Sequence, residues 1–103
     1  VIEERLMGAA TSLCSCGTAY ILRYVRAAME GGVELGLYPD QAKEMVIQTV
    51  KGAVELLEKS GLHPEAEIDK VTTPGGLTIK GLNKMEQCGF TTAVIEGLKA
   101  SVK

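Results

Sequence analysis

The sequence predicts an all-α domain of five to six helices, and three observations support this. Apolar residues recur at spacings of three and four through most of the 103 residues. Glycine and proline stand at intervals that suit the ends of helices. No stretch alternates apolar and polar residues for long enough to predict a β-strand. We therefore treat residues 1–103 as one helical domain with a single core.

The first part of the chain predicts two helices. Residues 1–13 are weakly helical, and the small residues at 14–17 interrupt this pattern. A second helix is expected over about 18–35, and Gly36 followed by Leu37 is typical of its end. Its apolar residues are too many for one narrow stripe: Ile21, Leu22, Tyr24, Val25, Ala28, Met29, Val33 and Leu35.

Two adjacent glycines, Gly31 and Gly32, lie inside this second helix. A glycine in a helix interior costs about 1 kcal/mol relative to alanine. Either the pair lets another helix pack closely, or it is a weak point. The sequence leaves both interpretations open.

A third helix is expected to begin at Pro39 and to end at Gly61. Its apolar and small residues repeat at helical spacing: Ala42, Met45, Val46, Thr49, Val50, Ala53, Val54 and Leu57. His63 and Pro64 then start a short helix that reaches about Val71. His63 is therefore expected at a helix start rather than as a catalytic base.

The last part of the chain predicts a fourth full helix after Pro74, which ends at Gly89. A final helix carries Phe90, Val94, Leu98 and Val102 at intervals of four on one face. Two of the predicted helices are apolar most of the way round and must be buried on most sides. One chain with four aromatic residues has little to cover them, so we expect an intertwined homodimer or a higher oligomer.

Composition excludes several classes of partner. The formal net charge is −2 and no basic stripe is present, so nucleic acid is not an expected partner. No apolar run approaches the roughly 18 residues that would span a membrane. An odd count of three cysteines without a secretion signal indicates reduced thiols and a cytoplasmic protein. The chain begins at Val1 within a helical pattern, so we expect it to be part of a longer chain; the alternative is that processing removed a start methionine.

No metal site is expected. Cys14 and Cys16 are too closely spaced for a typical zinc site, and His63 is the one histidine of the sequence. The cysteines are more simply small packing residues.

The stretch VTTPGGLTIKGL at 71–82 places two glycines where a helix should begin. Thr73 suits the N-cap and Pro74 the next position, which leaves Gly75 and Gly76 in the first turn with exposed amides. A helix N-terminus binds anions, and without a P-loop lysine a carboxylate is a plausible guest. The alternative is an ordinary capped helix with close packing at its glycines.

These residues carry a family resemblance. The segment DKVTTPGGLTIKGLNKMEQCGF resembles the signature of pyrroline-5-carboxylate reductase, and the similarity continues upstream over nearly the whole chain. The resemblance implies the C-terminal helical dimerisation and substrate-binding domain of an oxidoreductase of proline biosynthesis. That enzyme reduces 1-pyrroline-5-carboxylate to L-proline by hydride transfer from NADPH or NADH. No G-x-G-x-x-G follows a strand here, so the resemblance assigns the cofactor mainly to an absent N-terminal Rossmann domain.

The resemblance also implies a site. The family binds the substrate carboxylate with this loop, which corresponds to Thr73, Gly75, Gly76, Leu77 and Thr78. Thr78 matches the catalytic threonine near the ring nitrogen. A threonine hydroxyl is too weak an acid to hold a labile proton at neutral pH. We expect it to orient the imine nitrogen or to relay a proton from water.

One segment departs from the family pattern. Where the family often reads T-x-L-S-G-S-G-P-A-Y, this chain has TSLCSCGTAY. Cys14 and Cys16 replace serines, Ser15 replaces glycine, and Thr18 replaces proline, which puts polar contacts through those serines in doubt.

Two alternatives remain at the level of sequence. One is a non-catalytic helical dimerisation module. The other is a related dehydrogenase acting on another small imine or keto acid, against which the TTPGG match argues. With the Rossmann fingerprint missing, the segment alone is predicted to be inactive.

Overall fold

The computed structural model describes residues 3–102, and this range contains helices and no strand. The α-helices are α1 (Met7–Thr11), α2 (Gly17–Glu34), α3 (Pro39–Ser60), α4 (Pro64–Val71), α5 (Leu77–Gln87) and α6 (Phe90–Ala100). A short 3-10 segment, η1 (Glu4–Leu6), precedes α1, and a π-helical segment, η2 (Ser12–Cys16), joins α1 to α2. The predicted all-α class is confirmed.

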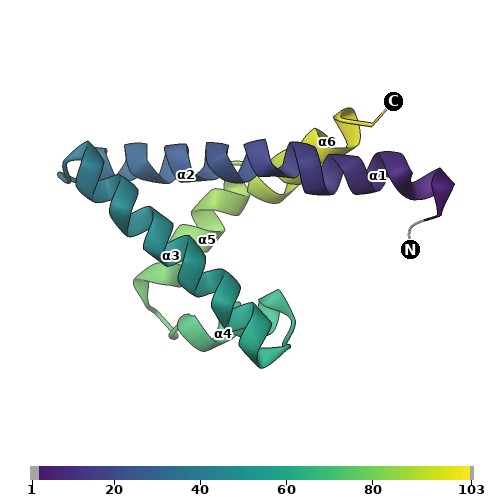
Figure 1. Cartoon of the computed structure of the whole chain (residues 1–103). Helices are drawn as coiled ribbons and strands as arrows, with labels where there is room; N and C mark the ends of the chain where they lie inside the picture. Colours follow the sequence, from purple (N-terminus) through teal and green to yellow (C-terminus); the bar gives the residue numbers. More distant parts are fainter. Residues whose placement is uncertain (1–2, 103) are drawn as a thin grey trace.

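The predicted interruption at residues 14–17 is a wide helical turn rather than a break. Through η2, α1 and α2 join into one long rod (Figure 1). Ser12 in η2 is buried, and its hydroxyl donates to the carbonyl of Leu98 at 2.8 Å. The small side chain of Ser12 therefore lets α6 pack against the rod, and the wide π turn continues the helix instead of ending it.

α2 and α3 form a hairpin whose turn follows the predicted glycine stop. Gly36 has φ of 112°, and its N–H donates to the carbonyl of Val33 at 2.9 Å. The N–H of Leu37 donates to the carbonyl of Gly32 at 3.0 Å. This pair of bonds is a Schellman motif, which satisfies the last carbonyls of α2 and turns the chain back.

The two glycines inside α2 differ in their surroundings. A Cβ on Gly32 would lie 3.2 Å from the Cβ of Ala42, which is 1% exposed. A Cβ on Gly31 would meet nothing within 4 Å. Close helix packing therefore explains Gly32, and it does not explain Gly31.

The second half of the chain returns to the rod. Gly61 and Gly89 adopt left-handed conformations, with φ of 67° and 88°, and end α3 and α5 as the sequence predicts. α6 then runs back to the rod, where the hydroxyl of Tyr20 bonds to the side chain of Ser101. The start of η1 and the end of α6 lie at the same end of the molecule (Figure 1).

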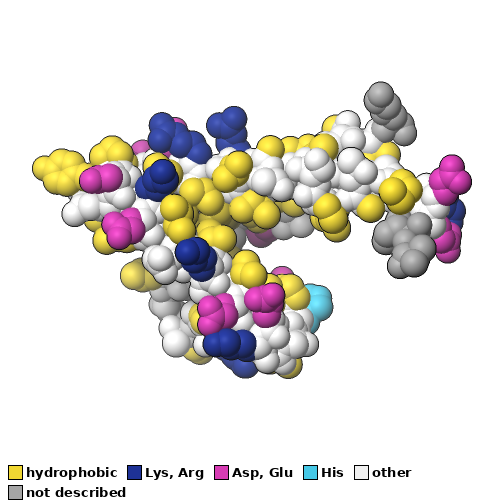
Figure 2. Space-filling view, viewed as in Figure 1, with side chains coloured by type: hydrophobic (Ala, Val, Ile, Leu, Met, Phe, Trp, Pro, Cys, Tyr) yellow, Lys and Arg dark blue, Asp and Glu magenta, His cyan; other side chains and the backbone are white. Residues whose placement is uncertain are grey.

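The described chain is elongated and has almost no core of its own. It measures 47 × 29 × 27 Å, and its radius of gyration is 15.8 Å, against about 13 Å for a compact domain of this length. Among residues 3–102, Ala42 is the one buried apolar residue. Apolar side chains spread over the visible surface of the rod and hairpin (Figure 2).

The solvent-exposed surface area also shows that the chain buries little of its apolar surface by itself. The structure exposes 8418 Å², whereas a monomeric protein of this mass is expected to expose about 5,600 Å². The excess of about 2,800 Å² is apolar to a large degree, because many large hydrophobic side chains are exposed, as Leu13 and Leu22 show at 65% and 62%.

Candidate functional site

The loop between α4 and α5 contains three of the five predicted site residues, Thr73, Gly75 and Gly76, and the other two, Leu77 and Thr78, begin α5. Residues Thr73 to Gly76 form a tight turn, in which the N–H of Gly76 donates to the carbonyl of Thr73 at 2.9 Å. Pro74 stands at the second position of this turn and Gly75, with φ of 72°, at the third. This order of proline and left-handed glycine is typical of a type II turn.

The predicted start of the following helix was wrong. Thr73 is not an N-cap and Pro74 is not the first helical residue, because α5 begins at Leu77 with Gly76 as its N-cap. The positive φ of Gly75 explains the difference, since a left-handed residue cannot continue a helix from Pro74. The first turn of α5 therefore lies after both glycines instead of containing them.

The glycines therefore lie in the turn before the helix and not, as predicted, in its first turn. Gly75 supplies the left-handed conformation of the turn, and Gly76 lies so close to Thr73 that a side chain at 76 would force a shift. The N–H of Gly76 is bonded within the turn, so it is not a free donor.

Free donors lie one residue further along. No side chain caps α5, so its first amides, beginning with Leu77 and Thr78, have no partner within the helix. Leu77 is 84% exposed and Thr78 is also exposed. Partial positive charge at this helix end adds to the two donors, and the arrangement suits a carboxylate.

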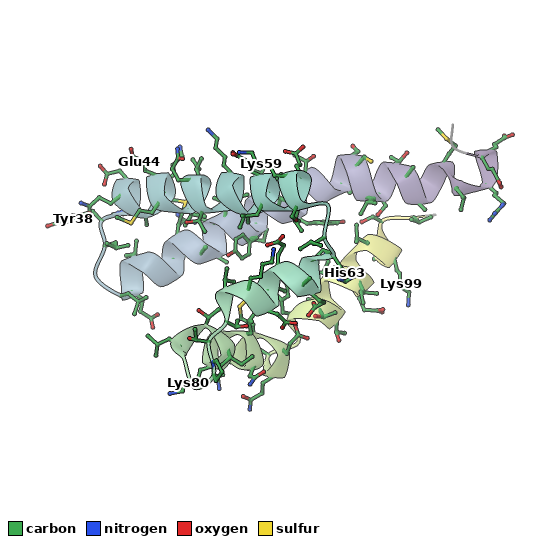
Figure 3. The ribbon with its side chains drawn as sticks, turned by 90° about the horizontal axis from the view of Figure 1, so that it is seen from below. Tyr38, Glu44, Lys59, His63, Lys80 and Lys99 are labelled. Carbon is green, nitrogen blue, oxygen red and sulfur yellow. The ribbon has the colours of Figure 1, made fainter. Side chains whose placement is uncertain are left out.

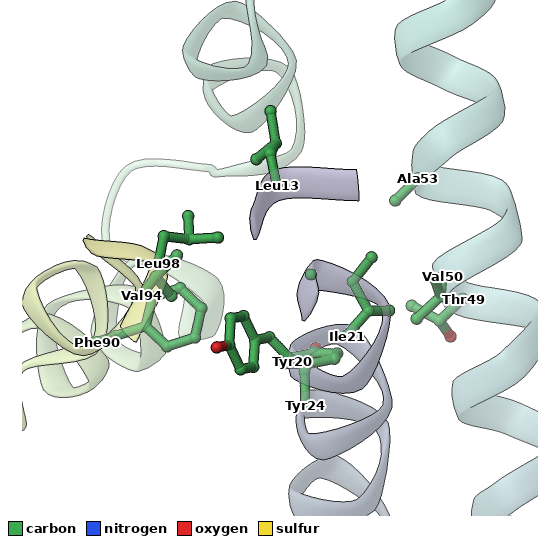
Figure 4. A pocket seen from close by; sticks show the side chains of 11 residues that line it. Leu13, Tyr20, Ile21, Tyr24, Thr49, Val50, Ala53, Phe90, Val94 and Leu98 are labelled. Carbon is green, nitrogen blue, oxygen red and sulfur yellow. The ribbon is translucent and has the colours of Figure 1, made fainter. Parts of the chain in front are cut away.

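Apolar grooves flank α2 and form a second candidate surface. One groove of about 460 Å³ lies between α2, α3 and α6, and Figure 4 shows its side chains. Tyr20 and Ile21 of α2 point into it, and Phe90, Val94 and Leu98 of α6 line one side. These last three residues confirm the apolar face predicted for the final helix, whereas Val102, the fourth residue predicted on it, lies beyond the end of α6 at Ala100. A second groove of about 550 Å³ lies on the α6 side of α2 and includes Met85 of α5.

His63 has the role that the sequence predicted, at the start of α4. The cysteines are unpaired: Cys14 and Cys88 are exposed, and Cys16 is half-buried. Within residues 3–102, no three or more histidine, cysteine and acidic side chains gather as metal ligands would. In the same range, no helix is both long and apolar enough to cross a membrane.

Comparison with known proteins identifies the family. Residues 4–103 match the family model described as pyrroline-5-carboxylate reductase dimerisation. The chain is 50% identical over 101 residues to pyrroline-5-carboxylate reductase 1 of Dictyostelium discoideum, covering 98% of this chain and 18% of that protein. It is 39% identical over 102 residues to the Synechocystis reductase, covering 99% of this chain and 38% of that protein.

Solved structures agree with this assignment. Plasmodium falciparum pyrroline carboxylate reductase, solved with NADP bound, superposes with a TM-score of 0.94 at 34% identity, over 97% of this chain and 38% of that one. The Streptococcus pyogenes enzyme gives a TM-score of 0.95 at 33% identity, over 98% and 39%. The chain thus spans less than two fifths of each of these relatives. It belongs to the pyrroline-5-carboxylate reductase family, as the helical dimerisation domain.

Proposed function

We propose that residues 1–103 are the C-terminal domain of a chain that reduces 1-pyrroline-5-carboxylate to L-proline. In this reaction a hydride adds to the carbon of the C=N bond, and the ring nitrogen takes up a proton. The segment contributes two parts, the dimer interface and the loop that holds the substrate carboxylate. Family membership and the geometry of the α4–α5 loop support this proposal.

One observation carries the substrate assignment: α5 begins without a side-chain cap, immediately after a turn that contains two glycines. The N–H groups of Leu77 and Thr78 would donate to the substrate carboxylate. Gly75 and Gly76 leave the approach free of side chains, and Thr73 forms the wall of the turn. An anion at this position would gain both donors and the dipole of α5.

Thr78 has the catalytic role in this proposal. Its hydroxyl would orient the imine nitrogen and pass a proton from water to it, since threonine cannot itself act as a strong acid. Its exposed position at the start of α5 leaves it accessible to a bound ring.

The cofactor is NADPH or NADH, and it supplies the hydride when bound. The described residues are helical, and none of them forms the strand, glycine-rich loop and helix that bind a dinucleotide. We therefore assign the cofactor site mainly to a Rossmann domain that precedes this segment in the parent chain. The isolated segment is expected to be inactive and to lack nicotinamide-nucleotide affinity.

The partner is a second copy of the same chain. The exposed apolar surface and the two grooves beside α2 support a homodimer in which each copy completes the other's core. A cytoplasmic location remains our sequence-based prediction.

Kinetics of the intact parent chain test the proposal. Thr78→Ala should lower kcat/KM for 1-pyrroline-5-carboxylate by roughly ten- to a thousandfold, the scale of one polar contact in a transition state. Thr78→Ser keeps the hydroxyl and should retain much of the activity. Thr92→Ala, at an exposed threonine of α6, is the matched control. A folded Thr78→Ala variant with the parent rate would contradict the role of Thr78. A parent chain that neither binds NADPH nor forms L-proline would instead favour a non-catalytic dimerisation module.

A further inference from the structure

The short helix α4 leads directly into the candidate substrate loop. It has eight residues, and a helix of this length is not stable without support from its ends and neighbours. Figure 3 shows that it runs from His63, where the chain turns out of α3, towards the start of α5 near Lys80. The position of the loop therefore depends on how α4 is held.

A histidine caps the N-terminus of this helix. The Nδ1 atom of His63 accepts a hydrogen bond from the N–H of Glu65 at 3.0 Å. Pro64 between them has no N–H to satisfy, and the carbonyl of His63 accepts from Ala66 at 2.9 Å. Because Nδ1 is the acceptor, the ring must be neutral, with its proton on Nε2.

The C-terminus of α4 is tied in a similar way. The hydroxyl of Thr72 donates to the carbonyl of Ile68 at 3.0 Å, directly before the turn that starts at Thr73. At the other end, the N–H of Leu62 donates to the hydroxyl of Ser60 at 3.1 Å. Side-chain hydrogen bonds thus hold α4 from its entry to the first residue of the loop.

Protonation would break the cap at His63. An imidazolium carries N–H groups on both nitrogens, so Nδ1 would present a donor to the N–H of Glu65. The partial positive charge of the helix end adds to this opposition. Histidine is the side chain whose ordinary charge change falls between pH 5 and 8, so a comparison across this range tests the cap.

Charged residues of both signs lie in α4 and in the last turns of α3. α3 packs against α4, and the charged side chains near this junction are Glu55, Glu58, Lys59, Glu65, Glu67, Asp69 and Lys70. The Lys59–Glu55 and Lys70–Glu67 ion pairs each lie within one helix. None of these side chains hydrogen-bonds to the His63 ring, so none of them would replace the acceptor that the N–H of Glu65 loses on protonation.

We propose that His63 is a positioning residue for the substrate loop, and that a proton on its ring loosens α4 and weakens substrate binding. This inference rests on the proposed function of the loop. Its consequence is that KM rises in mild acid through a group that touches neither the substrate nor the cofactor.

The test compares the intact parent chain with His63→Asn and His63→Ala at pH 7.5 and 5.5. Asparagine is a good N-cap that does not titrate in this range, whereas alanine cannot cap. At each pH we measure KM for 1-pyrroline-5-carboxylate and the hydrogen-exchange protection of the α4 amides. The ratio of parent KM to His63→Asn KM cancels changes in the ionisation of the substrate.

The proposal expects this KM ratio to rise by about two- to tenfold at pH 5.5, within the scale of one N-cap. Protection of α4 should fall in the parent and stay constant in His63→Asn. His63→Ala should have a raised KM at both pH values. Equal α4 protection at both pH values in the parent would overturn the proposal, as would lost protection with an unchanged KM ratio. Failure of the proposed function is separate, since it would show as an unchanged rate in Thr78→Ala.

Discussion

The hydroxyl oxygen of Thr73 lies 2.5 Å from the position that a Cβ atom on Gly76 would occupy. A side chain at 76 would force the Thr73 side chain or the turn to shift. The carbonyl of Thr73, at 3.1 Å from the same point, narrows the space further. Because α5 starts at the next residue, a shift of the turn would also move the first free amides of the helix.

Gly76→Ala should therefore disturb the substrate loop. We expect kcat/KM of the intact chain to fall by about ten- to a hundredfold, because a shift of about 1 Å in a binding group has effects of this size. Gly76→Val should be worse, and worse than Thr78→Ala. The control is Gly81→Ala in the same helix, where a Cβ meets nothing within 4 Å.

A double variant separates crowding of residue 76 by the Thr73 hydroxyl from other effects of the Gly76→Ala substitution. Thr73→Ala removes the hydroxyl that a Cβ at 76 would meet first. Thr73→Ala with Gly76→Ala should thus lose less activity than the two single effects combined, with a measurable coupling energy. Strictly additive losses would show that Gly76 matters for a reason other than this contact.

The two glycines of α2 should respond to alanine in opposite directions. Gly32→Ala inserts a methyl group 3.2 Å from the Cβ of Ala42, and overpacking of this kind costs about 1–3 kcal/mol. Gly31→Ala meets open space and should gain about 0.5–1 kcal/mol from helix propensity. Thermal unfolding at equal protein concentration measures both. A loss of stability in Gly31→Ala would place that residue against a partner chain.

The helix pattern could be predicted from the sequence because the strongest local signals agree with the fold. Gly36, Gly61 and Gly89 each end a helix in a left-handed conformation, as glycine followed by a new apolar pattern indicates. The apolar face of α6 also follows directly from its spacing of four.

The loop could not be predicted in detail, because two rules compete there. Threonine before proline is typical of a capped helix start, whereas Pro74-Gly75 is equally typical of a type II turn. The local sequence does not say which wins, and the structure has the turn. The π-helical course of residues 12–16 depends on packing against α6, which no local pattern encodes.

Glu67 should be replaceable with a gain in stability. This carboxylate in α4 is 8% exposed, and its Oε2 atom has no hydrogen-bond partner among the described residues. Lys70 lies 3.7 Å away, too far for a hydrogen bond, and its side chain is 59% exposed. Since a buried charge is costly, Glu67→Met should raise the free energy of unfolding by about 1–4 kcal/mol.

The matched control for this prediction is Glu65→Met in the same turn of α4. Glu65 is exposed and favours the helix N-terminus, so its loss should lower stability by about 0.3–1 kcal/mol. Denaturant unfolding at a fixed protein concentration compares the two variants. Destabilisation by Glu67→Met would instead indicate that a cation of a partner chain pairs with this carboxylate.

Dimer formation should be inseparable from folding in this chain. The excess of about 2,800 Å² of exposed surface per chain amounts to about 5,600 Å² for two chains, which is at the upper end of what obligate dimers bury, and the described residues of one chain provide almost no core of their own. Light scattering should give about twice the mass of 10.9 kDa, and the midpoint of thermal unfolding should rise with protein concentration. Val94→Asp places a charge in the apolar groove beside α2, and a symmetric dimer contains this substitution in both copies. The variant should therefore lose both the dimer and the helical signal. Glu96→Gln, on the exposed side of α6, should leave both intact. A folded Val94→Asp monomer with full helical content would show that the chain is stable alone, because its core would then not require a second copy.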